Sequence, residues 1–519
     1  NAVENLNAEN YMYGGLDFNS MMEYAAGIWC DRLHTIDVES KDAAKVNQFY
    51  GALYRASFLP HEMSDVNGDY PEFSTGTVKM GNATLSSKGY AVPAYSYLRK
   101  YGDFSMWDIY RAELPLYSLI TPKMSGEMMQ SLVQMYKEGG WMPIFPCWNS
   151  YTAAMIGDHS GAALADAYVK GIRNFDAAKA YEGMRLNAFS TPYLAKDYRD
   201  GKGRRAIRSY MDNGYIPLED MVEEAFHTNE QTSRTLEYAF DDYAVAQMAK
   251  ALHDSCQDAS LRQKYLEDYN DLMRRSENWR NVINPATGWA DGRYENGKWE
   301  NNEDLVHRKS YITEGATCHY TWYVPQNPEG LFEVIRNSKP MDKQEKQIEK
   351  MERKMEKKGE TPVRNEKVIA RLDKMFDNGW YWHGNEPCHQ VAYLYDAAGA
   401  PEKTQERVHH ILQTEYNDTP GGLSGNDDAG QMSAWYVFSS IGFYPVCPGT
   451  PYYYIGTPSF DKVTLNLENG RKFILSADGV SKDAFYIQKM SLNDKPFWGY
   501  KLSHKDILNG GKLKFQMKK

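Results

Sequence analysis

The sequence predicts a mainly α-helical protein, built as a barrel of helix hairpins and closed by a small C-terminal β-rich subdomain. Apolar residues recur at three- and four-residue spacing from about residue 17 to residue 450, which is the period of an amphipathic helix. Loops rich in Gly, Pro, Trp and Tyr separate these segments, so we expect paired helices whose loops gather around one mouth. Beyond residue 451, short alternating segments replace the helical period.

The expected helices are the segments with the strongest helical period. They are Phe18–Leu33, Lys41–Ser57, Ser105–Tyr117, Glu127–Gly139, Ala163–Gly171, Ala177–Ser190, Arg234–Ser255, Ser260–Val282, Lys367–Phe376, Val391–Ala398 and Lys403–Glu415. A chain of 519 residues exceeds the usual single-core limit of about 250–300 residues unless its helices wrap around one toroid. An α-solenoid is the alternative, but no repeat of fixed period supports it. We therefore expect residues 1–450 to form the barrel.

The last part of the chain, residues 451–519, reads as a small β-rich subdomain. Its expected strands are Tyr453–Ile455, Lys462–Leu467, Lys472–Ser476, Ala484–Ser491 and Lys512–Gln516. Asn469 and Gly470 form a typical hairpin turn between two of them.

One segment of the barrel region differs from the rest. Met341–Thr361 is dense in Lys and Glu and contains no aromatic residue. Such a run is typical of a solvated helical insertion, and we expect it to have no catalytic role.

Composition excludes several functions. A formal net charge of −10 lacks the basic footprint of a nucleic-acid-binding protein. No run of about 18 apolar residues exists, so no membrane span is expected. The six cysteines include no Cys-x-x-Cys pair, which weakens a zinc or thiol-redox interpretation. Aromatic residues make up 13 % of the chain, which fits either core filling or surfaces on which sugars stack.

The most informative loop contains Asn426, Asp427 and Asp428 between glycines, immediately before an apolar, aromatic helix. Acidic side chains at a helix N-terminus are stabilised by its unpaired N–H groups and its dipole. Two adjacent carboxylates beside an Asn also suit a cation or a general base. Local sequence leaves both interpretations open.

Two further loops place acids beside aromatic residues. Asp108 and Arg111 fall on one helix face next to Trp107, as a surface ion pair or as part of a sugar-binding wall. Glu314 lies among β-branched and aromatic residues before a glycine. An apolar pocket would raise its pKa and keep it protonated, as a general acid requires, whereas the alternative is a helix-capping Glu.

Another loop carries Glu386 before a proline, which holds this residue out of the α region. His389 and Gln390 follow. No standard zinc spacing is present, and the oxygen-rich loops favour a hard cation such as calcium. One protonated and one ionised carboxyl group between aromatic walls are the requirements of glycoside hydrolysis, the simplest chemistry that unites these loops.

At these residues the chain resembles glycoside hydrolase family 92, the calcium-dependent, inverting exo-α-mannosidases. The motifs that carry the resemblance are Gly425–Tyr436, Gly384–Pro387, Arg234–Ala239, Trp107–Arg111 and Met155–Ser160. Together they extend over essentially the whole chain. The resemblance implies an (α/α)6 barrel that binds mannose in its mouth and releases it from a glycan.

The resemblance also implies residue roles. Glu314 matches the general acid and Asp428 the general base, with Asp427 in support. An inverting pair of carboxyls should lie about 6.5–9.5 Å apart, which leaves room for the attacking water. Calcium would contact the mannose hydroxyls. The residues expected near the ion are Gln390, Asn426 and Asp428; those expected to bind substrate are Trp107, Asp108, Arg111, Asn385, Glu386 and His389.

Three departures from the family pattern matter. Members usually carry an N-terminal β-sandwich, which here a separate chain or domain would have to supply. The acid motif, commonly Glu-Gly-Asn-x-Trp-Gln-Tyr, reads Glu-Gly-Ala-Thr-Cys-His-Tyr from Glu314. Asn385 stands where α-1,2-specific members have His, which favours an α-1,3, α-1,4, α-1,6 or substituted mannoside.

The expected function is therefore an exo-α-mannosidase that acts on glycans. The alternatives are a catalytically impaired glycan-binding or scaffolding relative, and another glycosidase or a lyase on the same barrel. We expect an extracytoplasmic location (periplasmic, cell-surface or secreted), although the chain starts at Asn1 with no visible signal peptide.

Overall fold

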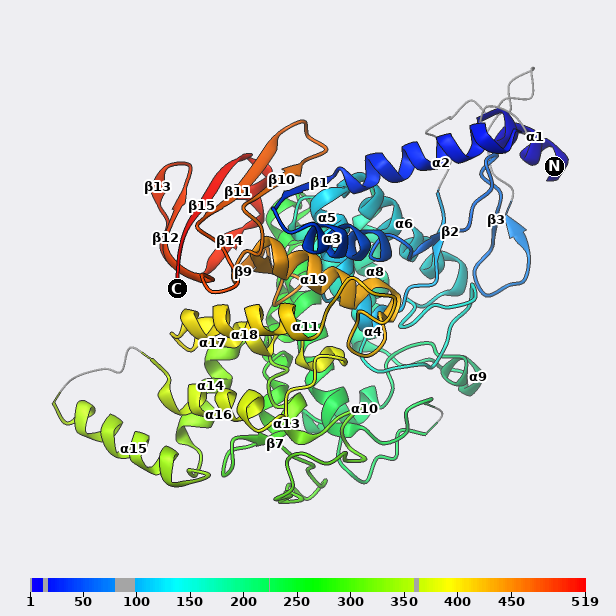
Figure 1. The fold of residues 1–519 in the computed structure, drawn as a ribbon. Helices are drawn as coiled ribbons and strands as arrows, with labels where there is room; N and C mark the ends of the chain where they lie inside the picture. The colour runs from blue at the N-terminus through cyan, green and yellow to red at the C-terminus, as the bar shows by residue number, and fades with distance from the viewer. Residues whose placement is uncertain (1, 13–16, 80–98, 224, 359–363) are drawn as a thin grey trace.

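The computed structural model describes residues 2–12, 17–79, 99–223, 225–358 and 364–519 (Figure 1). The helices are α1 (Ala2–Met12), α2 (Phe18–Leu33), α3 (Ala43–Arg55), α4 (Met106–Ile109), α5 (Glu113–Ile120), α6 (Pro122–Gly139), α7 (His159–Val169), α8 (Ala177–Phe189), α9 (Ala195–Arg199), α10 (Ile207–Asn213), α11 (Gln231–Ser255), α12 (Ala259–Arg275), α13 (Thr317–Tyr320), α14 (Pro328–Asn337), α15 (Lys343–Glu356), α16 (Glu366–Asp377), α17 (Leu394–Ala397), α18 (Pro401–Thr414), α19 (Gln431–Ile441) and α20 (His504–Leu508). Single 3-10 turns are η1 (Asn278–Asn281), η2 (Glu386–Cys388), η3 (Val391–Tyr393) and η4 (Asp428–Gly430). The strands are β1 (Ile36–Glu39), β2 (His61–Glu62), β3 (Tyr70–Pro71), β4 (Val78–Lys79), β5 (Tyr101–Gly102), β6 (Ile283–Asn284), β7 (Trp289–Ala290), β8 (Phe443–Tyr444), β9 (Tyr452–Ile455), β10 (Lys462–Asn466), β11 (Lys472–Asp478), β12 (Tyr486–Leu492), β13 (Lys495–Pro496), β14 (Lys501–Ser503) and β15 (Gly511–Lys518).

The protein is mainly helical with a small sheet region, as predicted, and most expected helices are present. The clearest difference is the predicted helix Ser105–Tyr117, which divides into α4 and α5. The backbone N–H groups of Ala112 and Glu113 donate to the side-chain Oε1 of Gln431, at 2.9 and 3.3 Å, instead of to the preceding turn. The helical period cannot reveal this break, because its cause lies more than 300 residues away along the chain.

Helix α11 is the central element of the larger core. It packs against α12, α7 and α8, and Figure 1 shows it behind α18 and α19 in the middle of the molecule. Hydrophobic residues of α6, α7, α8, α11 and α12 form one continuous buried cluster. A second cluster joins α3, α18 and α19 to the C-terminal strands.

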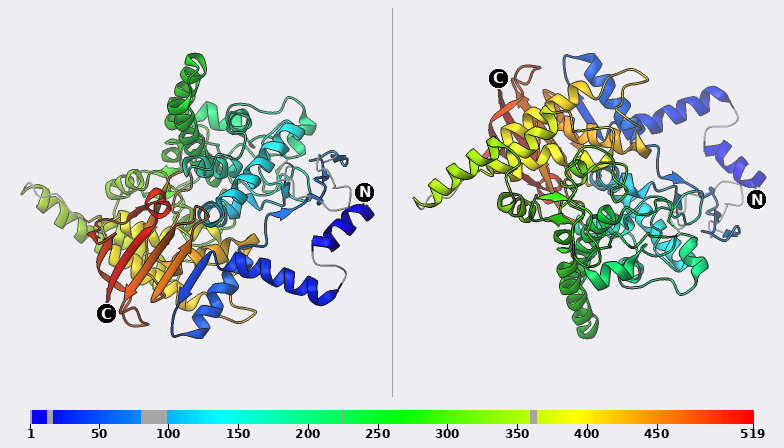
Figure 2. Two further views of the ribbon diagram at one scale, coloured as in Figure 1. Left: turned by 90° about the horizontal axis from the view of Figure 1, so that it is seen from above. Right: turned by 90° about the horizontal axis from the view of Figure 1, so that it is seen from below.

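The main sheet has six strands in the order β1-β10-β11-β15-β12-β13. Only the β11–β15 pair is parallel, and the other neighbours are antiparallel. Residues of β11 alternate between buried and more exposed, as a half-buried strand requires. The predicted turn between β10 and β11 is present, and Gly470 adopts φ 79° there. Figure 2 shows this sheet along one side of the helical body.

The edge strand β1 comes from the N-terminal part of the chain. Ile36 pairs with Leu465 and Val38 with Val463, so four residues after α2 extend the sheet by one strand. β1 is not predicted from the sequence, because a strand this short between two helices has little periodicity of its own. The sheet therefore ties the first and last parts of the chain together.

The charged segment predicted to be a solvated insertion contains α15, which projects from the body in Figures 1 and 2. Asp342 caps α15 by accepting from the Glu345 N–H at 3.0 Å. The base of the helix is fixed, because the fully buried Glu345 pairs with Arg371 of α16 at 3.2 Å. Residues 359–361 lie outside the described part of the chain. Within that part, every helix is too short or too polar to span a bilayer.

Replacing Ile36 by Ala tests the contribution of β1. Ile36 is fully buried, so Ile36→Ala should lower the free energy of unfolding by about 2–5 kcal/mol, as truncation of a buried Ile does. The exposed Glu39 of the same strand pairs with Lys462, and Glu39→Ala should cost less than about 1 kcal/mol. Urea unfolding of both variants measures the difference. Equal, small losses would show that β1 adds little to the sheet.

Candidate active site

Three acidic side chains from distant parts of the sequence meet in one place. Asp108 of α4, Glu386 of η2 and Asp428 of η4 each offer a carboxylate oxygen, and these oxygens lie within 4.8 Å of one another. We call this group the acid cluster. Asp108 and Glu386 are buried and Asp428 is partly exposed, so the cluster has one side open toward solvent.

The acid cluster favours protonated carboxyls. Burial, followed by the charge of Asp428, raises the pKa of Asp108 to about 8. Burial and the charges of Asp108 and Asp428 hold the pKa of Glu386 well above its ordinary range. The pKa of Asp428 is raised as well, chiefly by burial. Carboxylates this close repel one another strongly in a partly buried site, and a bound proton or cation would relieve that repulsion.

The donor set of the acid cluster suits a hard cation. Among the described residues, neither carboxyl oxygen of Glu386 has a hydrogen-bond partner, although the side chain is fully buried. Asp108 accepts one short hydrogen bond, from the Ser105 hydroxyl. Free carboxylate oxygens of this kind are the ligands that calcium prefers. The cluster thus fits the calcium expected from the sequence.

The predicted metal ligands are only partly those that the structure brings together. Of Gln390, Asn426 and Asp428, only Asp428 belongs to the acid cluster. Gln390 is buried and its amide donates to the Pro387 carbonyl at 3.1 Å. Asn426 is exposed. The other two acids of the cluster were expected to bind substrate.

Glu314 lies at the edge of the same site. It is partly exposed and adopts a left-handed backbone conformation, with φ 46°. Burial raises its pKa, and the charge of Asp428 adds to this effect, so the two carboxyls interact electrostatically. The Asn385 amide donates to the Glu314 carbonyl at 3.1 Å and accepts from the Glu386 N–H at 3.2 Å. Asn385 therefore joins the Glu314 loop to the acid cluster.

Asp428 is presented by an unusual turn. Asp428, Ala429 and Gly430 all have positive φ, at 45°, 61° and 103°. Strained backbone of this kind persists where the surroundings hold it in place, and it concentrates at functional sites. Gly430 is required here, because a Cβ atom would lie 3.0 Å from both Ala56 Cα and Glu113 Oε2. The turn is therefore clamped between α3 and α5.

Asp427 was expected to support the base, and its contacts in the structure are with residues of α19 and α3. Its Oδ1 accepts from the Ser433 N–H at 3.0 Å and from the Ser433 hydroxyl at 2.7 Å, which caps the first turn of α19. Its other oxygen lies 4.0 Å from Arg55 Nε. The two adjacent acids of this loop therefore have different surroundings, since Asp427 accepts from the first turn of α19 and Asp428 lies in the acid cluster.

His389, expected to bind substrate, is fully buried and both ring nitrogens have protein partners. Nε2 lies 3.1 Å from the His383 carbonyl, and Nδ1 lies 3.2 Å from the Gln431 amide nitrogen. Burial, together with the Arg111 charge, lowers its pKa to about 3. A neutral imidazole that donates to His383 and accepts from Gln431 satisfies both contacts, so the ring of His389 is held in one orientation.

Trp107 and Arg111 lie beneath the acid cluster in α4 and the turn after it. Both are almost completely buried. The Trp107 indole N–H donates to Glu237 Oε1 at 2.9 Å. The Arg111 guanidinium lies 5.0 Å from the centre of the Trp107 ring and 3.9 Å from Glu237. Glu237 lies within the motif Arg234–Ala239, and its local sequence gives no signal of these contacts.

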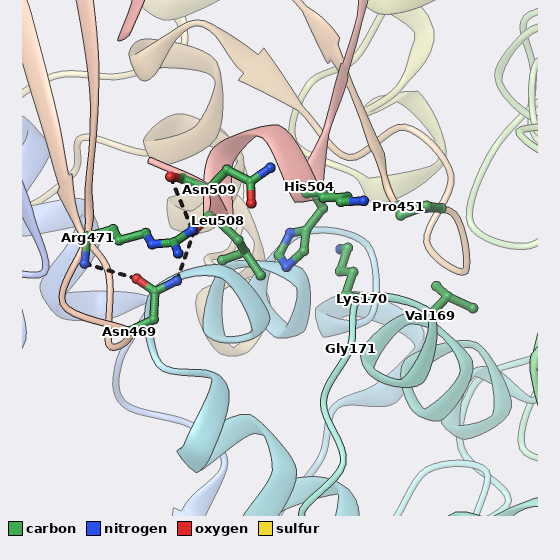
Figure 3. Close-up of a pocket in the computed structure, with 10 residues that line it drawn as sticks. Val169, Lys170, Gly171, Pro451, Asn469, Arg471, His504, Leu508 and Asn509 are labelled. Carbon is green, nitrogen blue, oxygen red and sulfur yellow. Dashed lines mark hydrogen bonds between the residues drawn. The ribbon is translucent and has the colours of Figure 1, made fainter. Parts of the chain in front are cut away.

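A separate cavity of about 500 Å³ lies between the C-terminal end of α7, the turn between β10 and β11, and α20 (Figure 3). It is lined by Lys170, Arg471 and His504, among others. Lys170 pairs with Asp166 at 2.7 Å. His159 is the first residue of α7, and Lys170 follows its last residue, 11 positions later. At 1.5 Å per residue, the cavity therefore lies about 16 Å along α7 from His159. It contains none of the predicted site residues.

Comparisons with known proteins identify the family of the chain. A family model described as the glycosyl hydrolase family 92 catalytic domain matches residues 1–519. A solved family 92 α-mannosidase from Bacteroides thetaiotaomicron is 31 % identical with a TM-score of 0.80, over 98 % of this chain and 60 % of its own. An inverting mannosidase of the same family and organism is 30 % identical with a TM-score of 0.80, over 96 % of this chain and 63 % of its own.

A curated relative, described as an uncharacterized secreted glycosidase of Arthroderma benhamiae, is 29 % identical over 440 residues. The match covers 79 % of this chain and 51 % of that relative. The chain thus spans about half the length of this relative and about three-fifths of the two solved mannosidases.

Truncation of Asp427 tests its capping role. Asp427→Ala should lower the free energy of unfolding by about 0.5–2 kcal/mol, because the Ser433 N–H loses its acceptor at the start of α19. Asn426→Ala, at the exposed neighbouring position, should change it by less than about 0.5 kcal/mol. Denaturant titration of both variants gives the values. Identical stability of the two variants would contradict the cap.

Proposed function

The chain belongs to glycosyl hydrolase family 92, and we propose that it hydrolyses terminal α-linked mannose from glycans with inversion of configuration. The observation that carries this proposal is the meeting of Asp108, Glu386 and Asp428 at one point, beside a Glu314 whose pKa is raised. The solved relatives support the sugar, since one family 92 α-mannosidase was determined with mannoimidazole.

Glu314 is the proposed general acid. A carboxyl with a raised pKa retains its proton closer to neutral pH and can donate it to the leaving glycosidic oxygen. The partly exposed position of Glu314 leaves its carboxyl accessible from the open side of the site. The bridge from Asn385 fixes the backbone carbonyl of Glu314 relative to the acid cluster.

Asp428 is the proposed general base. It is the most exposed member of the acid cluster, so a water molecule can reach it from the open side. In an inverting reaction this carboxylate removes a proton from the water that attacks the anomeric carbon, while the acid protonates the leaving group on the other side. We expect the Glu314 and Asp428 carboxyls to lie about 6.5–9.5 Å apart. Asp427 supports the base by capping the helix behind it.

Asp108, Glu386 and Asp428 are the residues proposed to hold calcium. When bound, the ion supplies a positive charge that binds sugar hydroxyls and offsets the repulsion among the three carboxylates. The residues around it have separate tasks. Trp107 and Arg111 form the floor of the mannose subsite, and the neutral His389 keeps the wall behind Glu386 in place.

The contacts and identity of Asn385 are the basis for proposing which glycosidic linkage is hydrolysed. Its amide is already engaged with the Glu314 carbonyl and the Glu386 N–H, and Asn replaces the His of α-1,2-specific members at this position. We propose an α-1,3-, α-1,4- or α-1,6-linked mannose, or a substituted mannoside, as the substrate.

The architecture and location extend the proposal. The helices before residue 450 would close an (α/α)6 barrel, and residues 451–519, together with β1, would form the β-rich subdomain. A β-sandwich in the same or a separate chain would complete the mouth of the site. A location outside the cytoplasm is supported by the curated relative, which is described as secreted.

Glu314→Gln tests the general acid. Turnover of a mannoside with a poor leaving group should fall by about 10²–10⁴-fold. Turnover of a 2,4-dinitrophenyl α-mannoside, whose leaving group needs no proton, should fall far less.

In the wild type, kcat/KM should fall as pH rises through the raised pKa of Glu314, because the acid loses its proton. It should also fall as pH drops below the pKa of Asp428, because the base becomes protonated. Glu314→Gln should abolish the alkaline limb.

An equal loss on both substrates would contradict the role of Glu314. Binding of mannosides by the wild type without any turnover would indicate the glycan-binding alternative instead.

Calcium titration tests the acid cluster independently of activity. Calcium at about 100 times its Kd should stabilise the fold by about 2.7 kcal/mol, measured as a rise in Tm over an EDTA-treated sample. Glu386→Gln should greatly reduce this rise. Glu113→Gln is the matched control, because Glu113 is equally buried and its two carboxyl oxygens have no hydrogen-bond partner in the described part of the chain, but it lies outside the acid cluster. A Tm indifferent to calcium, or an unchanged rise in Glu386→Gln, would remove the ion from this site.

A further inference from the structure

We propose that Glu237 is a positioning residue that fastens the two sides of the active site to one another. This inference rests on the proposed function, because it concerns how the segments that carry Asp108 and Glu314 are held. Glu237 lies in α11 and is fully buried. It is separated from both segments in sequence, and no role in the reaction has been assigned to it above.

A single oxygen of Glu237 binds both segments. Glu237 Oε1 accepts from the Trp107 indole N–H at 2.9 Å and from the Tyr320 hydroxyl at 2.9 Å. Trp107 immediately precedes Asp108 in α4, and Tyr320 follows Glu314 by six residues at the end of α13. Arg111, in the turn after α4, lies 3.9 Å from the same oxygen. Glu237 is therefore the point at which the Asp108 and Glu314 segments share an anchor.

The second oxygen of Glu237 is fixed by a histidine. His159 Nε2 lies 3.0 Å from Glu237 Oε2, and His159 Nδ1 lies 2.7 Å from Asp241 Oδ1. Burial lowers the pKa of His159, but the two carboxylates outweigh it and raise this pKa to about 9. The imidazolium donates to both acids, so both oxygens of Glu237 have hydrogen-bond partners and its side chain is held in one orientation.

Two further features hold His159 in position against Glu237. The His159 ring stacks on Tyr110 at 3.9 Å between ring centres, which fixes its plane. Gly157 has φ 81°, and a Cβ atom there would lie 2.2 Å from His159 Nε2 and 2.8 Å from Glu237 Oε2. A glycine is thus needed for this contact to form. The motifs Met155–Ser160 and Arg234–Ala239, quoted in the family resemblance without a role, supply these parts.

The simpler alternative is that Glu237 only stabilises the core as a buried ion pair. The same helix offers a carboxylate that does only that. Asp242 is equally buried and binds Arg204 at 2.6 Å and Arg275 at 2.9 Å. It also accepts from the Tyr210 hydroxyl at 3.0 Å. None of these partners belongs to the Asp108 or Glu314 segments, so Asp242 is the matched control.

Three substitutions separate the two roles. Glu237→Ala removes the shared anchor and should lower kcat/KM on an aryl α-mannoside by about 10²-fold per folded enzyme, mainly through kcat, because a misplacement of about 1 Å has this effect. Glu237→Gln keeps a carbonyl oxygen for Trp107 and Tyr320 and should recover activity to within about tenfold of the wild type. Asp242→Asn should lower Tm yet leave kcat/KM within about threefold, because its partners lie outside the site.

Amide hydrogen exchange provides a readout that does not need turnover. Glu237→Ala should increase exchange in residues 105–111 and 314–320, whereas Asp242→Asn should leave both segments as in the wild type. Tyr320→Phe removes only one branch and should loosen 314–320 alone, which keeps the test decisive if Glu237→Ala fails to fold. If these exchange results are obtained but the wild type hydrolyses no mannoside, the proposed function is refuted and the anchoring role of Glu237 still stands.

Two results would overturn the positioning role. One is an unchanged kcat/KM and unchanged exchange in Glu237→Ala. The other is an equal loss in Glu237→Ala and Asp242→Asn, because Glu237 would then act only through the stability of α11.

Discussion

The rest of the structure depends on the charge pairing along α11. Glu237, Asp241 and Asp242 are fully buried in this helix and require cationic partners, because an unpaired buried charge costs several kcal/mol. The partners come from other parts of the chain: His159 begins α7, Arg204 lies before α10, and Arg275 ends α12. Arg204 also binds Asp158 at 2.9 Å. Each pair fixes the orientation of a neighbouring element against α11, which apolar packing alone does less specifically.

The acid cluster differs from the α11 network in the charges that surround its carboxylates. Along α11 each carboxylate faces a cation, whereas Asp108, Glu386 and Asp428 face one another. The charge of Arg111 partly lowers the pKa values of Asp108 and Glu386, but its guanidinium pairs with Glu237 at 3.9 Å and lies against aromatic rings. The protein thus satisfies its structural charges and leaves one group of acids unsatisfied. Burial, followed by repulsion from neighbouring carboxylates, raises the pKa values of the cluster and makes it suitable for a cation and for proton transfer.

Backbone strain accompanies the same site. Glu314 and Asp428 both have left-handed φ values, which non-glycine residues adopt at a cost. The Asp428 turn is held by α3, α5 and the cap that Asp427 provides for α19, and the Glu314 loop is held by Asn385. The cost is met by packing and hydrogen bonds from rigid helices. Consequently the two proposed catalytic carboxyls are held in defined positions although both belong to loops.

The sequence by itself determined the mainly helical class, most helix positions, the C-terminal strands and the family, because local periodicity, turn residues and motifs are contained in short stretches of chain. It could not determine β1, the break between α4 and α5, or the separate tasks of Asp427 and Asp428. Nor could it show that Asp108 and Glu386 join Asp428, or that His389 is enclosed by its partners. Each of these depends on contacts between residues far apart along the chain, such as Ile36 with Leu465 and Ala112 with Gln431. Only the tertiary structure brings such groups within hydrogen-bonding or Coulombic range, and that proximity decides which acids bind one another and which support the fold.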